Sequence, residues 1–382
     1  MAPLLFSPMA LGPFEIPNRM TVAPMCQYSA DDGSATAWHT HQLMNYAMSG
    51  AGIVMVEATA VERRGRLSHG CLGLYTDANE IALSQVMMDA KNVAPAGSRF
   101  GIQLAHSGRK GSVQRPWEGG RALGPSEDPW PVIASSALPF SHNYPTPAAL
   151  NEEGMQTVRE AFVQAALRSL RIGFDIIELH STHGYLLDSF LSPIANQRTD
   201  EYGGSLQNRT KFPLSVAKAV RAAVPKDKVF GMRITGTDWT NDGWSTEDAA
   251  NYSKSLKELG VDYLCVSSGG VAPGLPYPTG PGYQVPLAEN VKAITGLPTR
   301  TAGHIVVPEY AEEILQAGRA DMIALARAIL DNPHWIWHAA DRLGAKVCYP
   351  PQYERINPSM WKAAPIARPQ DFLHEGSKRL GS

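Results

Sequence analysis

The chain has 382 residues and a formal net charge of −2, and hydrophobic residues make up 44% of it and charged residues 18%. This balance is typical of a soluble globular protein, and it excludes a charge-driven partner such as nucleic acid or an anionic membrane. The apolar runs are shorter than the roughly 20 residues of a membrane span. The N-terminal segment also lacks the basic region of a secretion signal, so we expect a cytoplasmic protein.

The predicted elements begin with a hairpin over residues 1–19, where Gly12-Pro13 separates two apolar stretches. Eight short apolar runs follow, and a helix-length segment comes after each of them. The runs start at Met20, Gly52, Arg99, Gly173, Lys228, Val261, Leu297 and Ala320. Alternating strands and helices predict right-handed crossovers and a parallel sheet, and eight such units close a TIM barrel.

The segments between the runs have the amphipathic pattern of helices. In residues 161–171, for example, one side carries Phe162, Ala165, Ala166 and Leu170. A doubly wound sheet is the alternative α/β architecture. It is less favoured because no G-x-G-x-x-G motif and no P-loop follows any of the eight runs.

One long segment, residues 107–149, interrupts the repeat after the third strand and is rich in Pro, Gly, Ser and Trp. Long loops on compact barrels are usually functional lids or flexible insertions, and we interpret this one as a lid. We therefore expect one barrel domain over residues 1–361. Residues 362–382 have the composition of a disordered tail.

The cysteines are far apart in the sequence and form no C-x-x-C pair. They are Cys26, Cys71, Cys265 and Cys348. This spacing argues against a zinc or iron–sulfur site and against a disulfide framework, so we expect free thiols.

The C-terminal ends of barrel strands form the active site of this fold, and here they carry small residues and polar side chains. The candidates are Pro24, Met25, Cys26, Ala58, Gln103, His180, His183, Tyr185, Arg233, Ala302, Gly303, Ala326 and Arg327. Small residues let a flat ligand approach the backbone, and amide and guanidinium groups bind its polar edge. The pattern predicts a flat cofactor with a phosphate tail.

Six motifs resemble the Old Yellow Enzyme ene-reductases, and within them the thermophilic-like branch that includes the xenobiotic reductases. The motifs are APMCQYSA, VEATAV, GIQLAHSGRK, HSTHGYLLDSFLSPIANQRTDEYGGSLQNR, MRIT and IALARAILDNP. The resemblance runs from about Leu5 to Trp361. It implies an FMN-dependent TIM barrel that reduces the C=C bond of α,β-unsaturated carbonyl and nitro compounds with NADPH or NADH.

The resemblance also implies the cofactor contacts. The residues implied to hold the flavin ring are Pro24, Met25, Cys26, Ala58 and Gln103, and those implied to bind the FMN phosphate are Ala302, Gly303, Ala326 and Arg327. Arg233 would lie at the ring edge where negative charge grows on reduction. Cys26 would contact the flavin, although on its own it could be a small buried hydrophobe.

For the substrate, the resemblance implies that His180 and His183 bind the carbonyl or nitro oxygen while hydride leaves flavin N5. Tyr185 would then protonate the α-carbon, and Tyr28 would contact the substrate. On residues alone, His180 and His183 could be structural or could bind a metal, but no third ligand with suitable spacing is near.

Three charged residues near these motifs have no settled role in the sequence. Arg109 and Lys110 could be a solvated loop pair or could help to close the lid. Glu178 has the strand parity of His180 and should point inward, with no partner assigned.

Near the C-terminus, PPQYERINPSMW matches a pattern of the same branch in which an arginine of a neighbouring subunit reaches the active site. The resemblance thus implies that Arg355 has this role in a homodimer or homotetramer. A loose, solvated tail is the alternative. The branch commonly has a shorter Gly-Trp ending, which leaves the role of Trp361 open.

Two other functional classes stay open beside the ene-reductase. One is a flavin-dependent dienoyl-CoA or amine-oxidising relative, although such larger relatives carry a cysteine cluster and an extra dinucleotide domain. The other is a flavin-binding barrel without turnover, or a barrel that binds a sugar phosphate by Schiff-base chemistry.

Overall fold

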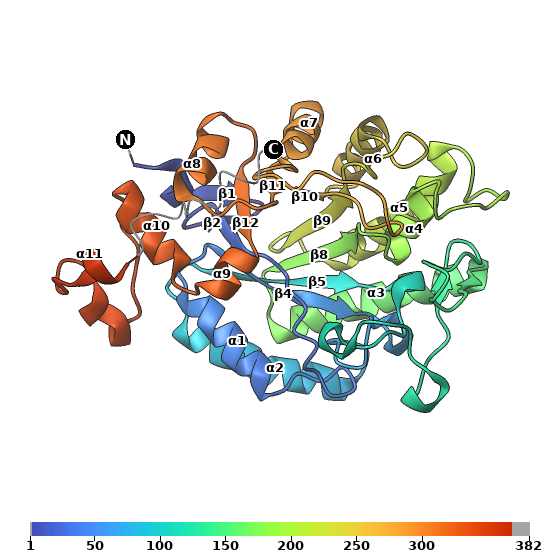
Figure 1. The fold of residues 1–382 in the computed structure, drawn as a ribbon, viewed down its shortest axis with the longest axis horizontal. Helices are drawn as coiled ribbons and strands as arrows, with labels where there is room; N and C mark the ends of the chain where they lie inside the picture. Colours follow the sequence, from blue (N-terminus) through green and yellow to red (C-terminus); the bar gives the residue numbers. More distant parts are fainter. Residues whose placement is uncertain (1, 369–382) are drawn as a thin grey trace.

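The computed structural model describes residues 2–368, and its centre is a closed barrel of eight parallel strands surrounded by helices (Figure 1). The strands are β3 (Met20–Val22), β4 (Ile53–Ala60), β5 (Arg99–Ala105), β8 (Ile176–Ser181), β9 (Val229–Thr235), β10 (Tyr263–Ser267), β11 (Thr299–Thr301) and β12 (Met322–Leu325). Each pairs with the next in this order, and β12 closes the ring on β3. The TIM barrel prediction is confirmed, and every predicted run contributes its strand.

Helices follow the strands, and all but the last of them surround the barrel. They are α1 (Ala37–Met48), α2 (Asp77–Val93), α3 (Glu152–Ile172), α4 (Leu186–Leu191), α5 (Leu206–Ala223), α6 (Thr246–Glu258), α7 (Val285–Thr295), α8 (Pro308–Gln316), α9 (Arg327–Asp331), α10 (Trp335–Leu343) and α11 (Ala364–Ala367). In α3, the Asn151 side chain caps the first turn by accepting the Gly154 N–H at 2.9 Å, and Gly173 ends the helix with a φ of +90°. Its buried face includes Phe162, Ala165 and Ala166, as predicted.

The N-terminal hairpin consists of β1 (Met9–Leu11) and β2 (Phe14–Ile16), and Gly12 makes the turn with a φ of +55°. Leu11 and Ile16 are buried against the first residues of four barrel strands, which are Ile53, Ile176, Val229 and Met322. Burial of each such aliphatic side chain contributes roughly 1.5–3 kcal/mol. The hairpin therefore closes the N-terminal end of the barrel, as expected, and leaves the other end for a ligand site.

The 107–149 segment is an insertion with short elements of its own. These are η3 (Gly108–Lys110), η4 (Pro116–Glu118), η5 (Pro125–Glu127) and the parallel pair β6 (Ile133–Ala134) and β7 (Ala148–Ala149). Ser135 Oγ donates to the Ser189 carbonyl oxygen at 2.6 Å, and the Val113 N–H donates to the Leu67 carbonyl oxygen at 3.0 Å. The insertion is thus bonded to the barrel at both its start and its end.

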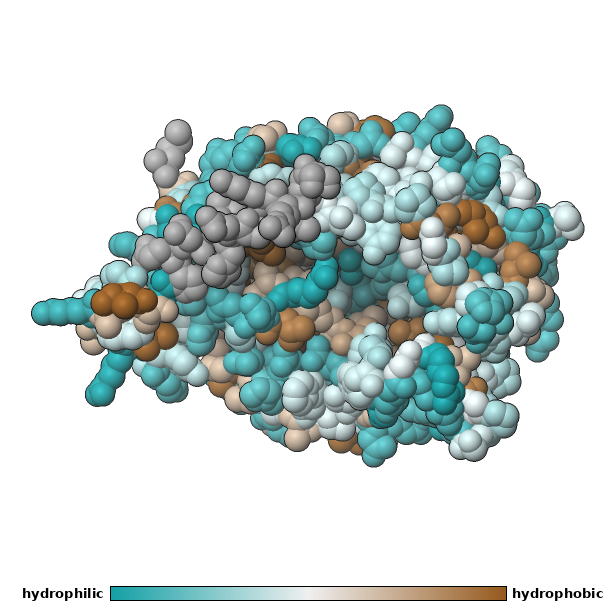
Figure 2. Space-filling model, in the orientation of Figure 1, coloured by the Kyte–Doolittle hydropathy of each residue, from teal (hydrophilic) through white to brown (hydrophobic). Residues whose placement is uncertain are grey.

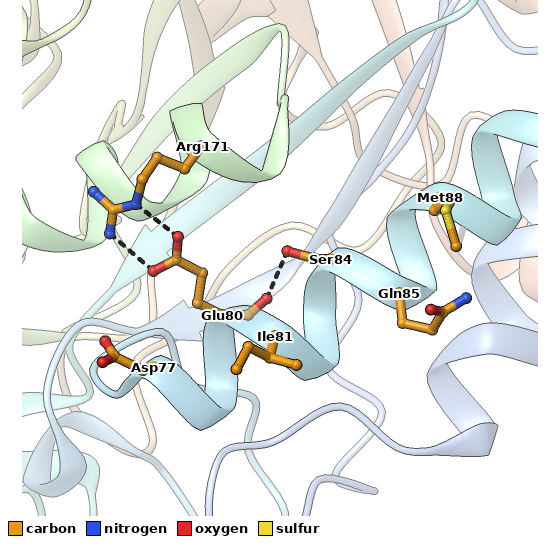
Figure 3. A pocket seen from close by; sticks show the side chains of 7 residues that line it. All are labelled: Asp77, Glu80, Ile81, Ser84, Gln85, Met88 and Arg171. Carbon is orange, nitrogen blue, oxygen red and sulfur yellow. Dashed lines mark hydrogen bonds and ion pairs between the residues drawn. The ribbon is translucent and has the colours of Figure 1, made fainter.

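On the outside of the barrel, α2 packs beside α3, and an ion pair joins them. The Glu80 carboxylate accepts hydrogen bonds from Arg171 Nε at 2.7 Å and Nη2 at 2.8 Å (Figure 3). The groove beside this pair encloses about 610 Å³ and is also lined by Ile81 and Met88. An exposed pair of this kind contributes at most about 1 kcal/mol.

A C-terminal extension follows α10 and contains η6 (Pro351–Ile356) and α11. Figure 1 shows that α11 projects at one end of the molecule, beyond the helices that surround the barrel. Residues 362–368, which the sequence assigns to a disordered tail, include this helix, whereas 369–382 lie outside the described residues. Within residues 2–368, the helices are too short or too polar to cross a bilayer. The face drawn in Figure 2 is mostly hydrophilic and is hollowed near its centre.

Candidate active site

The turn between β8 and α4 carries the three side chains predicted to act on a substrate. His180 lies near the end of β8, His183 lies in the turn, and Tyr185 is the N-cap of α4. The centre of the His180 ring is 5.2 Å from that of His183 and 4.9 Å from that of Tyr185. The structure therefore brings the three predicted catalytic side chains into one cluster.

The backbone of this turn has an unusual conformation, with φ angles of +61° at His183 and +73° at Gly184. A Cβ atom on Gly184 would lie 2.5 Å from the carbonyl oxygen of Gly270, so only glycine fits there. Two side chains hold the turn from either side. Asp188 Oδ2 accepts the Gly184 N–H at 2.6 Å, and Lys110 Nζ donates to the His183 carbonyl oxygen at 2.9 Å.

The protonation states of the cluster follow from its burial. Burial and the positive charge of Arg233 lower the pKa of His180 and of His183 well below the usual value, so both imidazoles are neutral at pH 7. Each neutral ring has one N–H to donate. Burial raises the pKa of Tyr185 well above its ordinary value, so its phenol keeps the proton.

Arg109 and Lys110 belong to the wall of the site. Arg109 is buried and donates through Nη2 to the Val271 carbonyl oxygen at 2.6 Å. Lys110 Nζ lies 5.1 Å from the centre of the Tyr185 ring, and burial lowers its pKa to about 8. This placement contradicts the solvated-pair alternative, because both cations are held by polar atoms of the site wall.

A cavity of about 790 Å³ opens beside His183, at the ends of strands β9 to β12. Five of its lining residues were predicted to bind the cofactor. They are Arg233, Ala302, Gly303, Ala326 and Arg327. At Gly303, where φ is +109°, a Cβ atom would lie 3.0 Å from the Tyr283 ring, so a larger residue would crowd this side of the cavity.

The donors around this cavity fit FMN. Among residues 2–368, the buried Nε of Arg233 has no hydrogen-bond partner, and its Nη2 reaches Ser267 Oγ at 3.4 Å. Arg327 is exposed and donates through Nη2 to His304 Nε2 at 2.9 Å. A guanidinium with an unpartnered Nε on one side, a second arginine on another and small residues between them match a flat ring with an anionic tail.

The other predicted cofactor contacts lie on or just after β3, β4 and β5, and β5 pairs with β8. They are Pro24, Met25, Cys26, Ala58 and Gln103, and none of them lines the 790 Å³ cavity. The Gln103 amide nitrogen donates to Glu178 Oε1 at 2.8 Å, so that part of its side chain points into the barrel. Burial, with a contribution from Glu57, raises the pKa of the Cys26 thiol, which stays protonated at neutral pH.

Two further predicted residues, Tyr28 and Arg355, do not line the 790 Å³ cavity. Tyr28 has a φ of +50°, and its ring contacts that of Trp117 from the insertion, with centres 5.9 Å apart. Arg355 lies exposed on η6 and is not among the residues lining the cavity.

Two residues that contact Glu178 and His183 were missed by sequence reasoning. Arg300 of β11 forms a fully buried ion pair with Glu178, which also accepts the Tyr263 hydroxyl at 2.6 Å, and this supplies the missing partner of Glu178. Ser267 ends β10 and lies with its Oγ 2.7 Å from His183 Nε2. The position of Ser267 at a strand end was the available signal.

Comparison with known proteins agrees with this geometry. Residues 4–345 match the NADH:flavin oxidoreductase / NADH oxidase family. An NADPH dehydrogenase of Geobacillus thermodenitrificans (strain NG80-2) is 40% identical over 357 residues, which cover 93% of this chain and 99% of that protein. An NADPH dehydrogenase of Listeria innocua (serovar 6a, strain ATCC BAA-680 / CLIP 11262) is 39% identical over 360 residues, which cover 94% of this chain and 99% of the relative.

Solved structures show the same architecture. Morphinone reductase has a TM-score of 0.74 at 26% identity, and the match covers 98% of this chain and 99% of the other. A 2-naphthoyl-CoA reductase complex has a TM-score of 0.78 at 25% identity and covers 90% of this chain but 52% of its own. The chain therefore belongs to the NADH:flavin oxidoreductase / NADH oxidase family and is an FMN-dependent oxidoreductase of the Old Yellow Enzyme type with a nicotinamide reductant.

Proposed function

We propose that this protein reduces the C=C bond of α,β-unsaturated carbonyl and nitro compounds, with NADPH or NADH as the source of electrons. The observation that carries the proposal is the cluster of His180, His183 and Tyr185, in which two neutral imidazoles lie beside a protonated phenol. Bound FMN supplies the hydride chemistry. The protein supplies oxygen binding and the proton.

The two histidines suit an oxygen atom that gains negative charge. His183 Nδ1 and His180 Nε2 lie 3.3 Å apart, so one carbonyl or nitro oxygen can approach both nitrogens at hydrogen-bond distance. Their neutral state leaves each ring one N–H and prevents repulsion between two cations. Loss of one such donor typically slows a reaction on the order of 100-fold to 1000-fold.

Tyr185 is the proposed general acid. Its phenol is protonated across the neutral range, and the Lys110 ammonium 5.1 Å from the ring centre favours the phenolate left after proton transfer. Delivery of a proton by such a group is usually worth about 100-fold to 10,000-fold in rate. Tyr185 thereby completes the reduction by protonating the α-carbon.

The alternative chemistries have weaker support. The match covers 52% of the 2-naphthoyl-CoA reductase chain and 48% of a histamine dehydrogenase chain, whereas it covers 99% of the NADPH dehydrogenase of Geobacillus thermodenitrificans (strain NG80-2). The four cysteines are dispersed and free. A barrel of this size with a site at its open end fits a reductase of small molecules better.

The test is an anaerobic experiment in two steps. The FMN-loaded protein is reduced with NADPH and is then mixed with 2-cyclohexen-1-one while flavin absorbance is recorded. We expect reoxidation that depends on the enone, with cyclohexanone as product. Reduction by NADPH without reoxidation by enones or nitroalkenes would contradict the proposal.

We also propose a homodimer or homotetramer in which Arg355 reaches a neighbouring active site. Arg355 is exposed on the projecting C-terminal extension. The same extension exposes 60% of Met360 and 89% of Ile366, and apolar side chains of this size exposed together are typical of an interaction surface.

A further inference from the structure

We propose that Ser267 is a positioning residue that fixes the tautomer of His183, with the ring proton on Nδ1. The inference rests on the proposed function, because the Nδ1–H is then the bond that His183 offers to the substrate oxygen. It assigns a role to a serine at the end of a barrel strand.

Ser267 is the last residue of β10 and is 1% exposed. Three side chains from different parts of the barrel converge on its hydroxyl oxygen. Its Oγ lies 2.7 Å from His183 Nε2, 3.2 Å from Gln284 Nε2 and 3.4 Å from Arg233 Nη2. The contact with His183 is the shortest of the three.

The direction of the serine O–H follows from counting donors and acceptors. A hydroxyl has one hydrogen to donate and two lone pairs to accept with. Arg233 has only donors, and the Gln284 amide nitrogen also donates, so these two residues occupy both lone pairs. The Ser267 hydrogen is left for His183 Nε2.

The tautomer of His183 follows in turn. Nε2 accepts the serine hydrogen and therefore carries none itself. A neutral imidazole must then carry its hydrogen on Nδ1, and burial near Arg233 keeps this ring neutral. Nδ1 is also the atom 3.3 Å from His180 Nε2, where the two rings can share one substrate oxygen.

The assignment of the Ser267 hydrogen depends on the orientation of the Gln284 side-chain amide. The Gln284 amide nitrogen also lies 3.1 Å from Ser268 Oγ and 3.0 Å from Tyr283 OH, so two N–H groups face three hydroxyl oxygens, and the assignment requires one of the two to point at Ser267. If the amide were rotated so that its oxygen faced Ser267, the serine would donate to Gln284 and His183 Nε2 would become the donor. The two arrangements predict opposite tautomers, and a spectrum separates them.

The experiment is a nitrogen–proton correlation spectrum of the FMN-loaded protein labelled with ¹⁵N-histidine, which distinguishes the protonated from the unprotonated ring nitrogen. His183→Asn identifies the His183 signals. We expect a protonated Nδ1 and an unprotonated Nε2 in the unmodified protein, and the same pattern in Ser267→Thr, which keeps the hydroxyl. In Ser267→Ala we expect a mixture of tautomers or the Nε2–H form.

A second variant tests the same hydrogen-bond assignment by changing the partner of Ser267. Gln284→Glu places a carboxylate acceptor beside Ser267, which should draw the serine hydrogen away and move His183 toward the Nε2–H form. An Nε2–H tautomer in the unmodified protein, or a His183 spectrum unchanged by Ser267→Ala, would overturn the inference.

Loss of the Ser267 hydroxyl should affect the reaction rate less than loss of the His183 ring. We expect Ser267→Ala to slow flavin reoxidation by 2-cyclohexen-1-one by less than the loss in His183→Ala, which is on the order of 100-fold to 1000-fold. The spectrum separates this inference from the proposed function. An Nδ1–H tautomer in a protein that does not reduce enones would overturn the function alone, and an Nε2–H tautomer in an active enzyme would overturn the inference alone.

Discussion

At Tyr185, burial has two opposite consequences for acid catalysis. A pKa raised well above the ordinary value keeps the phenol protonated, but it also makes the phenol a weaker acid. The cation of Lys110 beside the ring offsets the second effect, because it stabilises the phenolate more than the phenol. The tyrosine and the lysine therefore have to be considered as a pair.

The first prediction concerns the phenol itself. Tyr185→Phe removes only the hydroxyl, so flavin content and ring packing should persist. Flavin reoxidation by 2-cyclohexen-1-one should slow by about 100-fold or more, while strongly activated nitroalkenes are released as unprotonated nitronates. Stopped-flow measurement of both half-reactions tests this, and an unchanged oxidative half-reaction with the enone would exclude Tyr185 as the acid.

The second prediction concerns the charge of Lys110, whose pKa is lowered to about 8 by burial. Below this pH the ammonium is present, and above it the charge is lost. The rate of the oxidative half-reaction should therefore fall as the pH rises through about 8. Lys110→Arg keeps a positive charge at all these pH values, so its rate should stay level, whereas Lys110→Met should be slow throughout. A profile of Lys110→Arg that still falls near pH 8 would assign the titration to another group.

At the scale of elements, the turn between β8 and α4 shows how the fold fixes the site. His183 and Gly184 both have positive φ, and the conformation persists because Asp188 from α4 and Lys110 from the insertion bond its backbone. The packing against Gly270 leaves no space for a Cβ atom. The positions of the rings proposed to be catalytic thus depend on three segments at once: α4, the insertion and the loop that contains Gly270.

The third prediction uses two glycines with the same backbone angle. Gly184 and Gly204 both have a φ of +73°, but a Cβ on Gly184 meets the Gly270 backbone and one on Gly204 meets nothing within 4 Å. Gly204→Ala should cost about 1–2 kcal/mol of unfolding free energy from its backbone angle alone, with activity retained. Gly184→Ala should cost more and should also abolish enone reduction. Thermal unfolding and the oxidative half-reaction measure the two effects, and equal behaviour of the variants would contradict the argument.

The elements themselves could be predicted from the sequence because their signals are local. Each barrel strand is a short apolar run followed by a helix-length segment, and this repeat identifies the fold without any long-range contact. Candidate catalytic residues could be proposed because the motif around His180, His183 and Tyr185 resembles a known family. Ser267 could not be assigned a role from the sequence. Its inferred role depends on a hydrogen bond to His183, which is 84 positions away in the chain.

The same reason explains the buried ion pair below the site. Glu178 and Arg300 are separated by 122 positions in the chain, and they meet because their side chains point from β8 and β11 into the barrel interior. Arg300 lies in the three-residue strand Thr-Arg-Thr, which is too short and too polar for its sequence pattern to predict that the Arg300 side chain points inward. Gln103 and Tyr263 also donate hydrogen bonds to the Glu178 carboxylate, and these additional bonds offset part of the cost of burying its charge.

At the scale of the whole molecule, the two ends of the barrel have different tasks. The hairpin closes one end, and at the other the insertion packs over the strand ends. The C-terminal extension projects outward at the end of the molecule where α11 is labelled in Figure 1, away from the insertion. The extension is anchored to α10 by aromatic rings. The buried Trp337 stacks on His334 with ring centres 4.1 Å apart and contacts Tyr353 of η6 at 5.5 Å. This contact fixes η6, and with it Arg355, relative to the barrel.

The last prediction tests whether Arg355 acts on a neighbouring subunit. Arg355→Ala and Tyr185→Phe should each be nearly inactive with 2-cyclohexen-1-one, while both bind FMN. Co-expressed in one cell, the two variants form mixed oligomers in which the Arg355→Ala subunit keeps its own tyrosine and receives the arginine of its partner. In a dimer assembled at random, half of the oligomers are mixed and each has one complete site, so about a quarter of the normal activity should return.

Recovered activity would show that one site uses Tyr185 of one subunit and Arg355 of another, because no single chain in the mixture has both residues. If Arg355 served its own subunit, no mixed oligomer would contain a complete site and activity would stay at the level of the separate variants. Light scattering on the mixed sample supplies the number of subunits, and a tetramer made of such dimers gives the same recovery. A monomeric protein, or a mixture that stays inactive although mixed oligomers form, would show that the projecting extension does not complete a neighbouring site.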